Sequence, residues 1–331
     1  MQFTYPPRVS LAHLPTPIQP FRSDVFNHEA PTVFIKRDDL TGCALSGNKI
    51  RKLEFVIAEA QRQGADTLIT CGGAQSNHSR ATAVAAAQSG MSCQLVLRGT
   101  PDAEPDGNLL IDKMVGADIT YITPEQYSSQ RMEIMQSVAE QLATQDHKAF
   151  IIPEGASDAL GSWGYVAATE EIIKQLEAQH ITIDTIVCAT GSGGTLAGLI
   201  LGKALFEQSY DVIGINVCDD AAYFIDVVGA ILNDFQQTFH LKLGLSSADV
   251  RIIDGYVGQG YAISSQDELA FIHNIARTTG LLLDPVYTGK TMYGLTQQIN
   301  SGRFSKSSII LFVHTGGIFS LFPRRHELFS F

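Results

Sequence analysis

Residues 46–54 read Ser-Gly-Asn-Lys-Ile-Arg-Lys-Leu-Glu, and this stretch guides the interpretation of the whole chain. It places Lys49 where a Gly-Asn turn gives way to apolar residues at helical spacing. A lysine amine is normally charged and exposed, so the default interpretation is a surface lysine in the first turn of a helix. The amine forms a Schiff base only where a pocket lets it lose a proton. Two later segments favour that second interpretation.

The first is Gly191-Ser192-Gly193-Gly194-Thr195, between a predicted strand (185–188) and a predicted helix (195–206). Glycines let backbone N–H groups converge on an anion without a lysine or an arginine, and a helix N-terminus favours negative charge. A Walker loop is excluded at this position, because these glycines are not followed by Gly-Lys-Ser/Thr. The dinucleotide-binding pattern Gly-x-Gly-x-x-Gly is incomplete, because Leu196 stands at the position of its third glycine. Asp219 could mimic the ribose-binding acid, so a dinucleotide-binding oxidoreductase remains a competing interpretation.

The second segment is Gln75-Ser76-Asn77-His78, which follows a predicted strand (67–70) and two glycines. Serine and asparagine are favoured helix N-caps, and a purely structural cap is the simplest interpretation. The two roles are compatible, because N-terminal N–H groups and a capping serine can also bind a substrate carboxylate.

Composition restricts the class of protein. With 331 residues, two domains are expected, and 45% hydrophobic and 17% charged residues are typical of a globular protein. The net charge of −11 argues against nucleic-acid binding, and no apolar run is long enough for a membrane span. No signal peptide is visible, which favours a cytoplasmic location. The five cysteines form no Cys-x-x-Cys pair, so neither a disulfide framework nor a metal site is predicted. Cys71, Cys188 and Cys218 are interpreted as small core residues.

Predicted strands and helices alternate along the chain, which indicates parallel sheets flanked by helices. The other predicted strands are 32–35, 94–97, 119–122, 150–152, 212–215 and 308–312, and the other helices are 50–62, 79–88, 109–115, 124–143 and 164–178.

Taken together, these segments resemble the fold-type-II pyridoxal-phosphate (PLP) enzymes, in the branch that holds D-cysteine desulfhydrase and 1-aminocyclopropane-1-carboxylate (ACC) deaminase. The resemblance extends from Pro15 to Gly317. Its segments come in the family's order: Lys36-Arg37-Asp38-Asp39, the Lys49 and Ser76 blocks, Asp284-Pro285-Val286-Tyr287 and His314-Thr315-Gly316-Gly317.

The resemblance implies an α/β fold of two domains, each a mostly parallel twisted sheet flanked by helices, with PLP in the cleft between them. A large PLP-binding domain would comprise residues 1–50 and 154–331, and a smaller inserted α/β domain residues 51–153. A homodimer is also implied.

The resemblance further assigns roles to residues. Lys49 would hold PLP and act as the base, and Tyr261 and Tyr287 would direct their phenols at the substrate. The phosphate would be bound by the loop of Thr190, Gly191, Ser192, Gly193, Gly194 and Thr195. Asn77 would bond the PLP 3′-oxygen, and Ser76, Asn77 and His78 would face a small amino-acid substrate.

The choice of substrate is expected to depend on Thr288. ACC deaminases carry glutamate there, beside the pyridine nitrogen, whereas a neutral hydroxyl offers only a weak hydrogen bond. They also carry glutamine at the position of His78, where desulfhydrases carry histidine. Thr315 is the alternative partner for the ring nitrogen. The function implied is β-elimination from D-cysteine, giving pyruvate, hydrogen sulfide and ammonia. ACC deaminase, L-cysteate sulfo-lyase and a serine-type dehydratase stay open.

Overall fold

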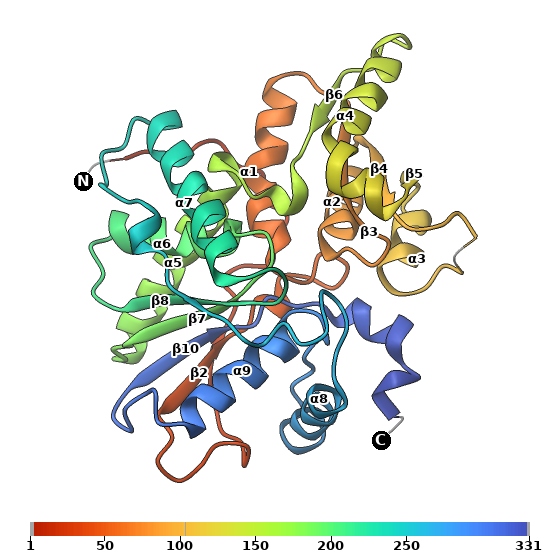
Figure 1. Ribbon diagram of the computed structural model, residues 1–331. Coiled ribbons are helices and arrows are strands. Elements are labelled where there is room, and N and C mark those ends of the chain that lie inside the picture. The colour runs from red at the N-terminus through yellow and green to blue at the C-terminus, as the bar shows by residue number, and fades with distance from the viewer. Residues whose placement is uncertain (1–2, 103, 330–331) are drawn as a thin grey trace.

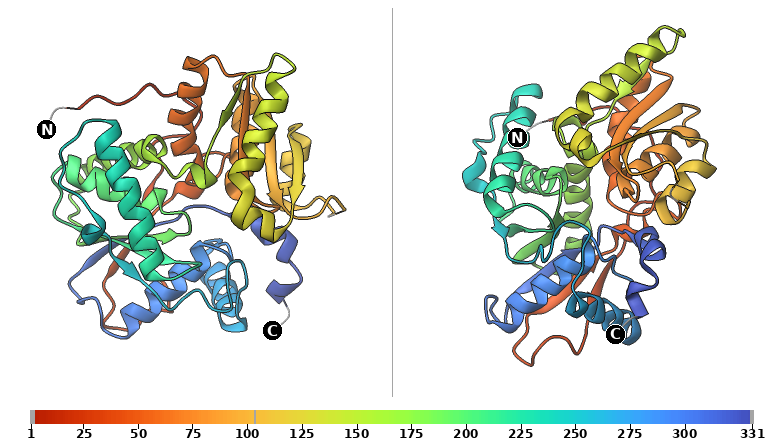
Figure 2. Two further views of the ribbon diagram at one scale, coloured as in Figure 1. Left: turned by 45° about the horizontal axis from the view of Figure 1, so that its top comes forward. Right: turned by 45° about the vertical axis from the view of Figure 1, so that its right-hand side comes forward.

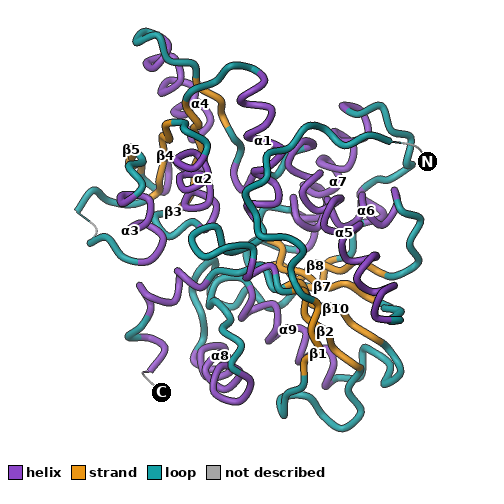
Figure 3. The backbone as a smooth tube through the Cα atoms, turned by 180° about the vertical axis from the view of Figure 1, so that it is seen from behind, coloured by secondary structure: helices purple, strands orange, loops and turns teal. Residues whose placement is uncertain are grey.

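The first of two sheets has the strand order β1-β2-β10-β7-β8-β9 in the computed structural model, which describes residues 3–102 and 104–329 (Figures 1 and 3). β1 is antiparallel to β2, and the other pairings are parallel. The strands are β1 (Ile18–Phe21), β2 (Thr32–Lys36), β7 (Thr185–Thr190), β8 (Asp211–Asn216), β9 (Ile252–Ile253) and β10 (Ile309–Val313).

Helices cover both faces of this sheet, which explains why β7 is buried along its whole length. On one face, α5 (Ala159–Gln179), α6 (Gly194–Leu205) and α7 (Ala221–Thr238) pack on Ile186 and Cys188. On the other face, α8 (Gln266–Thr279) and α9 (Thr288–Asn300) pack on Val187, whose side chain points the opposite way.

The second sheet is parallel and has the order β5-β4-β3-β6. Its strands are β3 (Thr67–Gly73), β4 (Ser92–Arg98), β5 (Asp118–Ile122) and β6 (Ala149–Ile151). The helices α2 (Asn77–Gln88) and α3 (Gly107–Met114) pack on one face and α4 (Pro124–Ala143) on the other. Figure 2 shows this unit as a separate lobe beside the larger sheet.

The helix α1 (Lys49–Arg62) joins the two units. Leu53 packs in the core of the second sheet, whereas Phe55 packs in that of the first. The α/β class with two mostly parallel sheets is therefore confirmed. Because every strand of the second sheet lies between residues 67 and 151, we keep 51–153 as the proposed inserted domain.

Each predicted strand and helix is present in the structure. The helix expected over 164–178 begins earlier, because Asp158 caps it by accepting the Gly161 N–H at 2.7 Å. The helices α7, α8 and α9 and the strands β1 and β9 were not predicted. No helix in the described part of the chain is long and apolar enough to cross a membrane, and no cluster of metal-ligating side chains is found there.

Candidate active site

A close approach between two loops places Lys49. Gly47 has φ +112°, and a Cβ there would lie 2.7 Å from the carbonyl oxygen of Thr315. That same oxygen accepts the backbone N–H of Asn48 at 3.1 Å. Only glycine tolerates this combination of dihedral angle and contact, so the Gly-Asn turn seats the first residue of α1 against the end of the large sheet.

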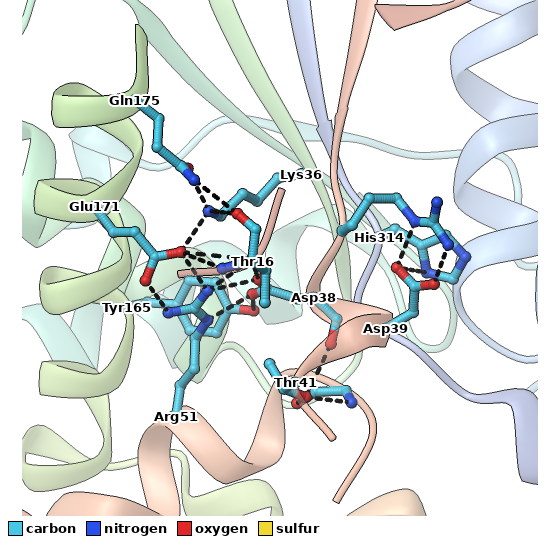
Figure 4. A network of polar contacts seen from close by, with 12 residues as sticks. Thr16, Lys36, Asp38, Asp39, Thr41, Arg51, Tyr165, Glu171, Gln175 and His314 are labelled. Carbon is cyan, nitrogen blue, oxygen red and sulfur yellow. Dashed lines mark hydrogen bonds and ion pairs between the residues drawn. The ribbon is translucent and has the colours of Figure 1, made fainter. Parts of the chain in front are cut away.

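A buried polar network holds the first turn of α1 (Figure 4). The Arg51 guanidinium donates to both carboxylate oxygens of Asp38, at 2.8 and 2.9 Å, and to Glu171 of α5 at 3.0 Å. Asp38 also accepts the hydroxyl proton of Tyr165 at 2.6 Å, and its pKa stays below the usual value because Arg51 outweighs the burial. Arg51, two residues after Lys49, is thus fixed to the segment that follows β2 and to α5.

Enclosure by protein changes the chemistry of Lys49. Burial lowers the pKa of its amine to about 8, against the opposing charge of Glu154. No hydrogen bond to this amine is found among residues 3–102 and 104–329. A lysine with a lowered pKa beside a cavity is a suitable nucleophile and base.

The glycines of the loop between β7 and α6 have no room for side chains. Gly193 caps α6 at φ +81°, and a Cβ on Gly194 would lie 2.7 Å from the Ser157 hydroxyl. A Cβ on Gly191 would lie 2.9 Å from the ring of Tyr287. The Asn48 side chain donates to the hydroxyl of Thr195 at 2.9 Å. Bare backbone at the start of a helix fits a phosphate group.

Two adjoining cavities bring most of the predicted residues together. The smaller is lined by Asn48, Lys49, Asn77, Ala189, Gly191, Ser192, Gly193, Thr195, Tyr287, Thr315 and Gly316. The larger, of about 480 Å³, shares Lys49 and Tyr287 and adds Ser76, His78 and Tyr261.

The segment of residues 75–78 lies at the start of α2 and at the wall of the larger cavity. The Ser76 hydroxyl caps α2 by accepting the Ser79 N–H at 3.1 Å, and the side chain also lines the larger cavity. His78 is buried, with Nε2 2.8 Å from the hydroxyl of Thr70, and burial followed by the charge of Lys49 lowers its pKa well below the usual value. His78 is therefore a neutral group at this wall.

The two tyrosines form a pair at the same cavity. Their hydroxyl oxygens lie 2.5 Å apart, and their rings meet edge to face with centroids 6.0 Å apart. Burial raises the pKa of Tyr261 to about 12, partly offset by the hydrogen bond with Tyr287, and burial raises the pKa of Tyr287 further.

Thr288 does not reach the cavities. The residue is fully buried. Its hydroxyl donates to the Asp284 carboxylate at 2.7 Å and accepts the backbone N–H of Asp284 at 2.8 Å. The reason is that the Asp284 carboxylate also accepts the backbone N–H of Thr288, the first residue of α9, at 2.7 Å, so the Thr288 side chain turns back toward Asp284. Of the two expected partners for a ring nitrogen, the structure brings only Thr315 to the site. Thr190 is also set back, with its hydroxyl buried at the end of β7.

Sequence reasoning missed Lys52, which lies one helical turn after Lys49. Its fully buried amine donates to the Ser157 hydroxyl at 3.3 Å, and that hydroxyl lies 2.8 Å from the hydroxyl of Ser192 in the glycine loop. A lysine amine therefore lies behind the loop, and burial followed by the charge of Lys49 lowers its pKa well below the usual value. Cys71 and Cys188 are buried as expected, whereas Cys218 is half-buried and lines the larger cavity.

A lysine beside a glycine-rich loop at a helix N-terminus, in a cavity between two α/β units, is typical of enzymes that hold a phosphorylated cofactor. A family model described as "Pyridoxal-phosphate dependent enzyme" matches residues 9–316. The chain belongs to this family of PLP-dependent enzymes, so the expected cofactor is confirmed and a dinucleotide-binding oxidoreductase is excluded.

Individual relatives indicate the branch of the family that the chain resembles. The chain is 42% identical to the bifunctional D-cysteine desulfhydrase/ACC deaminase of Arabidopsis thaliana, over 97% of this chain and 80% of that protein. It is 37% identical to a D-cysteine desulfhydrase of Klebsiella pneumoniae, over 97% of both chains. A crystal structure of an ACC deaminase homologue superimposes with a TM-score of 0.88 at 35% identity, over 98% of this chain and 96% of that one. The resemblance predicted from the sequence is confirmed.

Proposed function

We propose that this chain is a PLP-dependent lyase that converts D-cysteine and water to pyruvate, hydrogen sulfide and ammonia. The observation that carries the proposal is the meeting of Lys49, Ser76 and the Tyr261–Tyr287 pair at one cavity. The names of the relatives from Arabidopsis thaliana and Klebsiella pneumoniae support the choice of substrate. The proposed location is the cytoplasm. The proposed assembly is a homodimer, and light scattering would test this assembly.

Cofactor binding is assigned to the residues of the smaller cavity. Lys49 would hold PLP covalently, the glycine loop its phosphate, Asn77 its 3′-oxygen and Thr315 its ring nitrogen. Asn77 is held in place because its side-chain oxygen accepts a hydrogen bond from Asn108 at 3.0 Å. Bound PLP supplies an electron sink for the negative charge left at Cα when the proton departs.

The chain's own groups then bind the substrate and move protons. The N-terminal N–H groups of α2 and the Ser76 hydroxyl bind the substrate carboxylate. Lys49, with its lowered pKa, takes the Cα proton. The electron pair of the breaking C–S bond leaves with sulfur, and the Tyr261–Tyr287 pair orients the leaving group. Neutral His78 adds no charge to this wall.

Lys52 is proposed as a further phosphate-binding residue through Ser157. Replacing Lys52 with methionine should weaken PLP affinity, measured by titrating PLP into the apoenzyme. The matched control is Lys113→Met, in the last turn of α3. Equal PLP affinity in the two variants would remove Lys52 from the site.

ACC deaminase is the second candidate, supported by the bifunctional relative. The position of Thr288 removes the sequence argument against it, since that side chain does not reach the cavity. The test is release of 2-oxo acid from D-cysteine, L-cysteine, L-cysteate, D-serine and ACC by the purified holoenzyme. D-cysteine should give the highest kcat/KM, and a higher value for ACC would replace the first proposal with the second.

A further inference from the structure

The larger cavity holds an arginine to which the proposed chemistry gives no role. Arg98 is the last residue of β4, and its side chain lines the cavity together with Lys49 and Ser76. The guanidinium carbon lies 5.3 Å from the ring centroid of Tyr127 and 5.9 Å from that of Tyr261. Two aromatic rings therefore hold this cation beside one of the phenols of the tyrosine pair.

The charge of Arg98 has no counter-ion in the described part of the chain. The acids that line the cavity are Glu154 and Asp219. Glu154 lies 3.8 Å from Arg131, whose own guanidinium is on the Tyr127 ring, 5.4 Å from its centroid. Within residues 3–102 and 104–329, the Arg98 guanidinium forms no ion pair and no hydrogen bond. A half-enclosed cation with free donors favours an anionic ligand.

The location of Arg98 indicates which part of a substrate it would meet. The start of α2 is already assigned to the carboxylate and Lys49 to the Cα proton, which leaves the wall of Tyr261 and Arg98 for the β-substituent. Arg98, Tyr261 and Ser76 also line an adjoining cavity of about 340 Å³. This wall therefore has space for a group larger than a thiol.

We propose that Arg98 determines specificity by receiving a negatively charged β-substituent, an anionic sulfur group such as a thiolate or a sulfonate. The inference rests on the proposed function for its class of substrate, an amino acid with a substituent on Cβ. Beyond that function, Arg98 would recognise a negative charge at the β position, and this recognition is separate from that of the α-carboxylate.

The test compares D-aspartate with D-asparagine, which have the same shape and differ in the charge of the β-substituent. Each is titrated into the holoenzyme and its binding is followed by the visible absorbance of the bound cofactor. Wild type should bind D-aspartate roughly 10-fold more tightly than D-asparagine, the lower end of what a hydrogen bond to a charged group contributes. Arg98→Gln should bring this ratio near 1 with D-asparagine affinity unchanged, and Arg98→Lys should retain part of it.

The control is Arg277→Gln, an exposed arginine of α8, which should keep the wild-type ratio. An unchanged ratio in Arg98→Gln would overturn the proposal and reduce Arg98 to packing on Tyr127. Equal weakening of both ligands would also overturn it, because it would assign Arg98 to the α-carboxylate. Turnover of D-cysteine and of D-cysteate by Arg98→Gln then distinguishes a thiolate from a sulfonate. The substrate whose turnover falls more carries the group that Arg98 receives. The titration needs no turnover, so a charge preference without D-cysteine cleavage would contradict the proposed function and leave this inference standing.

Discussion

The hydroxyl oxygens of Tyr261 and Tyr287 lie 2.5 Å apart, although the two residues come from different loops. Burial raises the pKa of both phenols, and their hydrogen bond moves the two pKa values apart, so Tyr261 is the phenol that loses its proton first. The pair thus has one more acidic phenol, Tyr261, and a neighbouring phenol that is hydrogen-bonded to it.

Removing either phenol should impair proton handling. We expect Tyr261→Phe to lower kcat for D-cysteine roughly 100-fold or more, a usual range for general acid–base groups, with PLP still bound. Tyr287→Phe should lower kcat less and shift the alkaline limb of the pH–rate profile upward, because Tyr261 loses the hydrogen bond that lowers its pKa. The control is Tyr293→Phe, on α9 and outside the cavity. Unchanged kcat in Tyr261→Phe would refute the role of the pair.

The glycine loop should depend on the dihedral angle of Gly193. Gly193→Val forces a branched residue into φ +81°, at about 1–2 kcal/mol, and displaces the N–H groups at the start of α6. PLP affinity should fall more than the kcat of the PLP-saturated enzyme. Gly244→Val is the matched control, because Gly244 has φ +69° and a Cβ there would have no other atom within 4 Å. Equal loss of PLP affinity in both variants would show that general strain, rather than the phosphate loop, is responsible.

Thr288 should prove to be a structural residue. In Thr288→Glu, a second carboxylate would be buried against Asp284, and we expect the free energy of unfolding to fall by about 3 kcal/mol or more. Thr288→Ser keeps the hydroxyl and should stay close to wild type in urea denaturation. If Thr288→Glu were instead as stable as wild type and changed the absorbance of bound PLP, the side chain would face the ring after all.

The lowered pKa of Lys49 predicts a pH dependence for PLP uptake. The neutral amine is the nucleophile, and it predominates above its pKa, which burial brings to about 8. The rate at which apoenzyme reacts with PLP should therefore rise between pH 7 and 9 and level off above that range. A rate that kept rising toward the ordinary lysine value of 10.5 would show that burial does not act on this amine.

The sequence predicted those features that depend on local backbone chemistry. Gly47 and Gly193 require positive φ angles, and the strand–glycine–helix pattern around residue 193 is readable without a structure. The helix α8 was missed although Ser265 and Glu268 form a capping box, a signal that the sequence contains.

Features that depend on tertiary contacts could not be predicted. Thr288 follows Tyr287 in the chain, but one step along the start of a helix turns its side chain away from the cavity and toward Asp284. Lys52 and Arg98 are ordinary basic residues in sequence. Their relevance comes from Ser157 and Tyr261, which are distant in the chain and are brought near by the packing of the two units.

The central claim is that Lys49 carries the cofactor, and borohydride reduction of the purified holoenzyme tests it most directly. Reduction makes the bond between PLP and lysine permanent, and peptide mapping by mass spectrometry then identifies the modified residue. The account predicts a single phosphopyridoxyl group on Lys49, and none in Lys49→Ala, which should also release no pyruvate from D-cysteine. A phosphopyridoxyl group on Lys36, Lys52 or Lys290 would contradict the account.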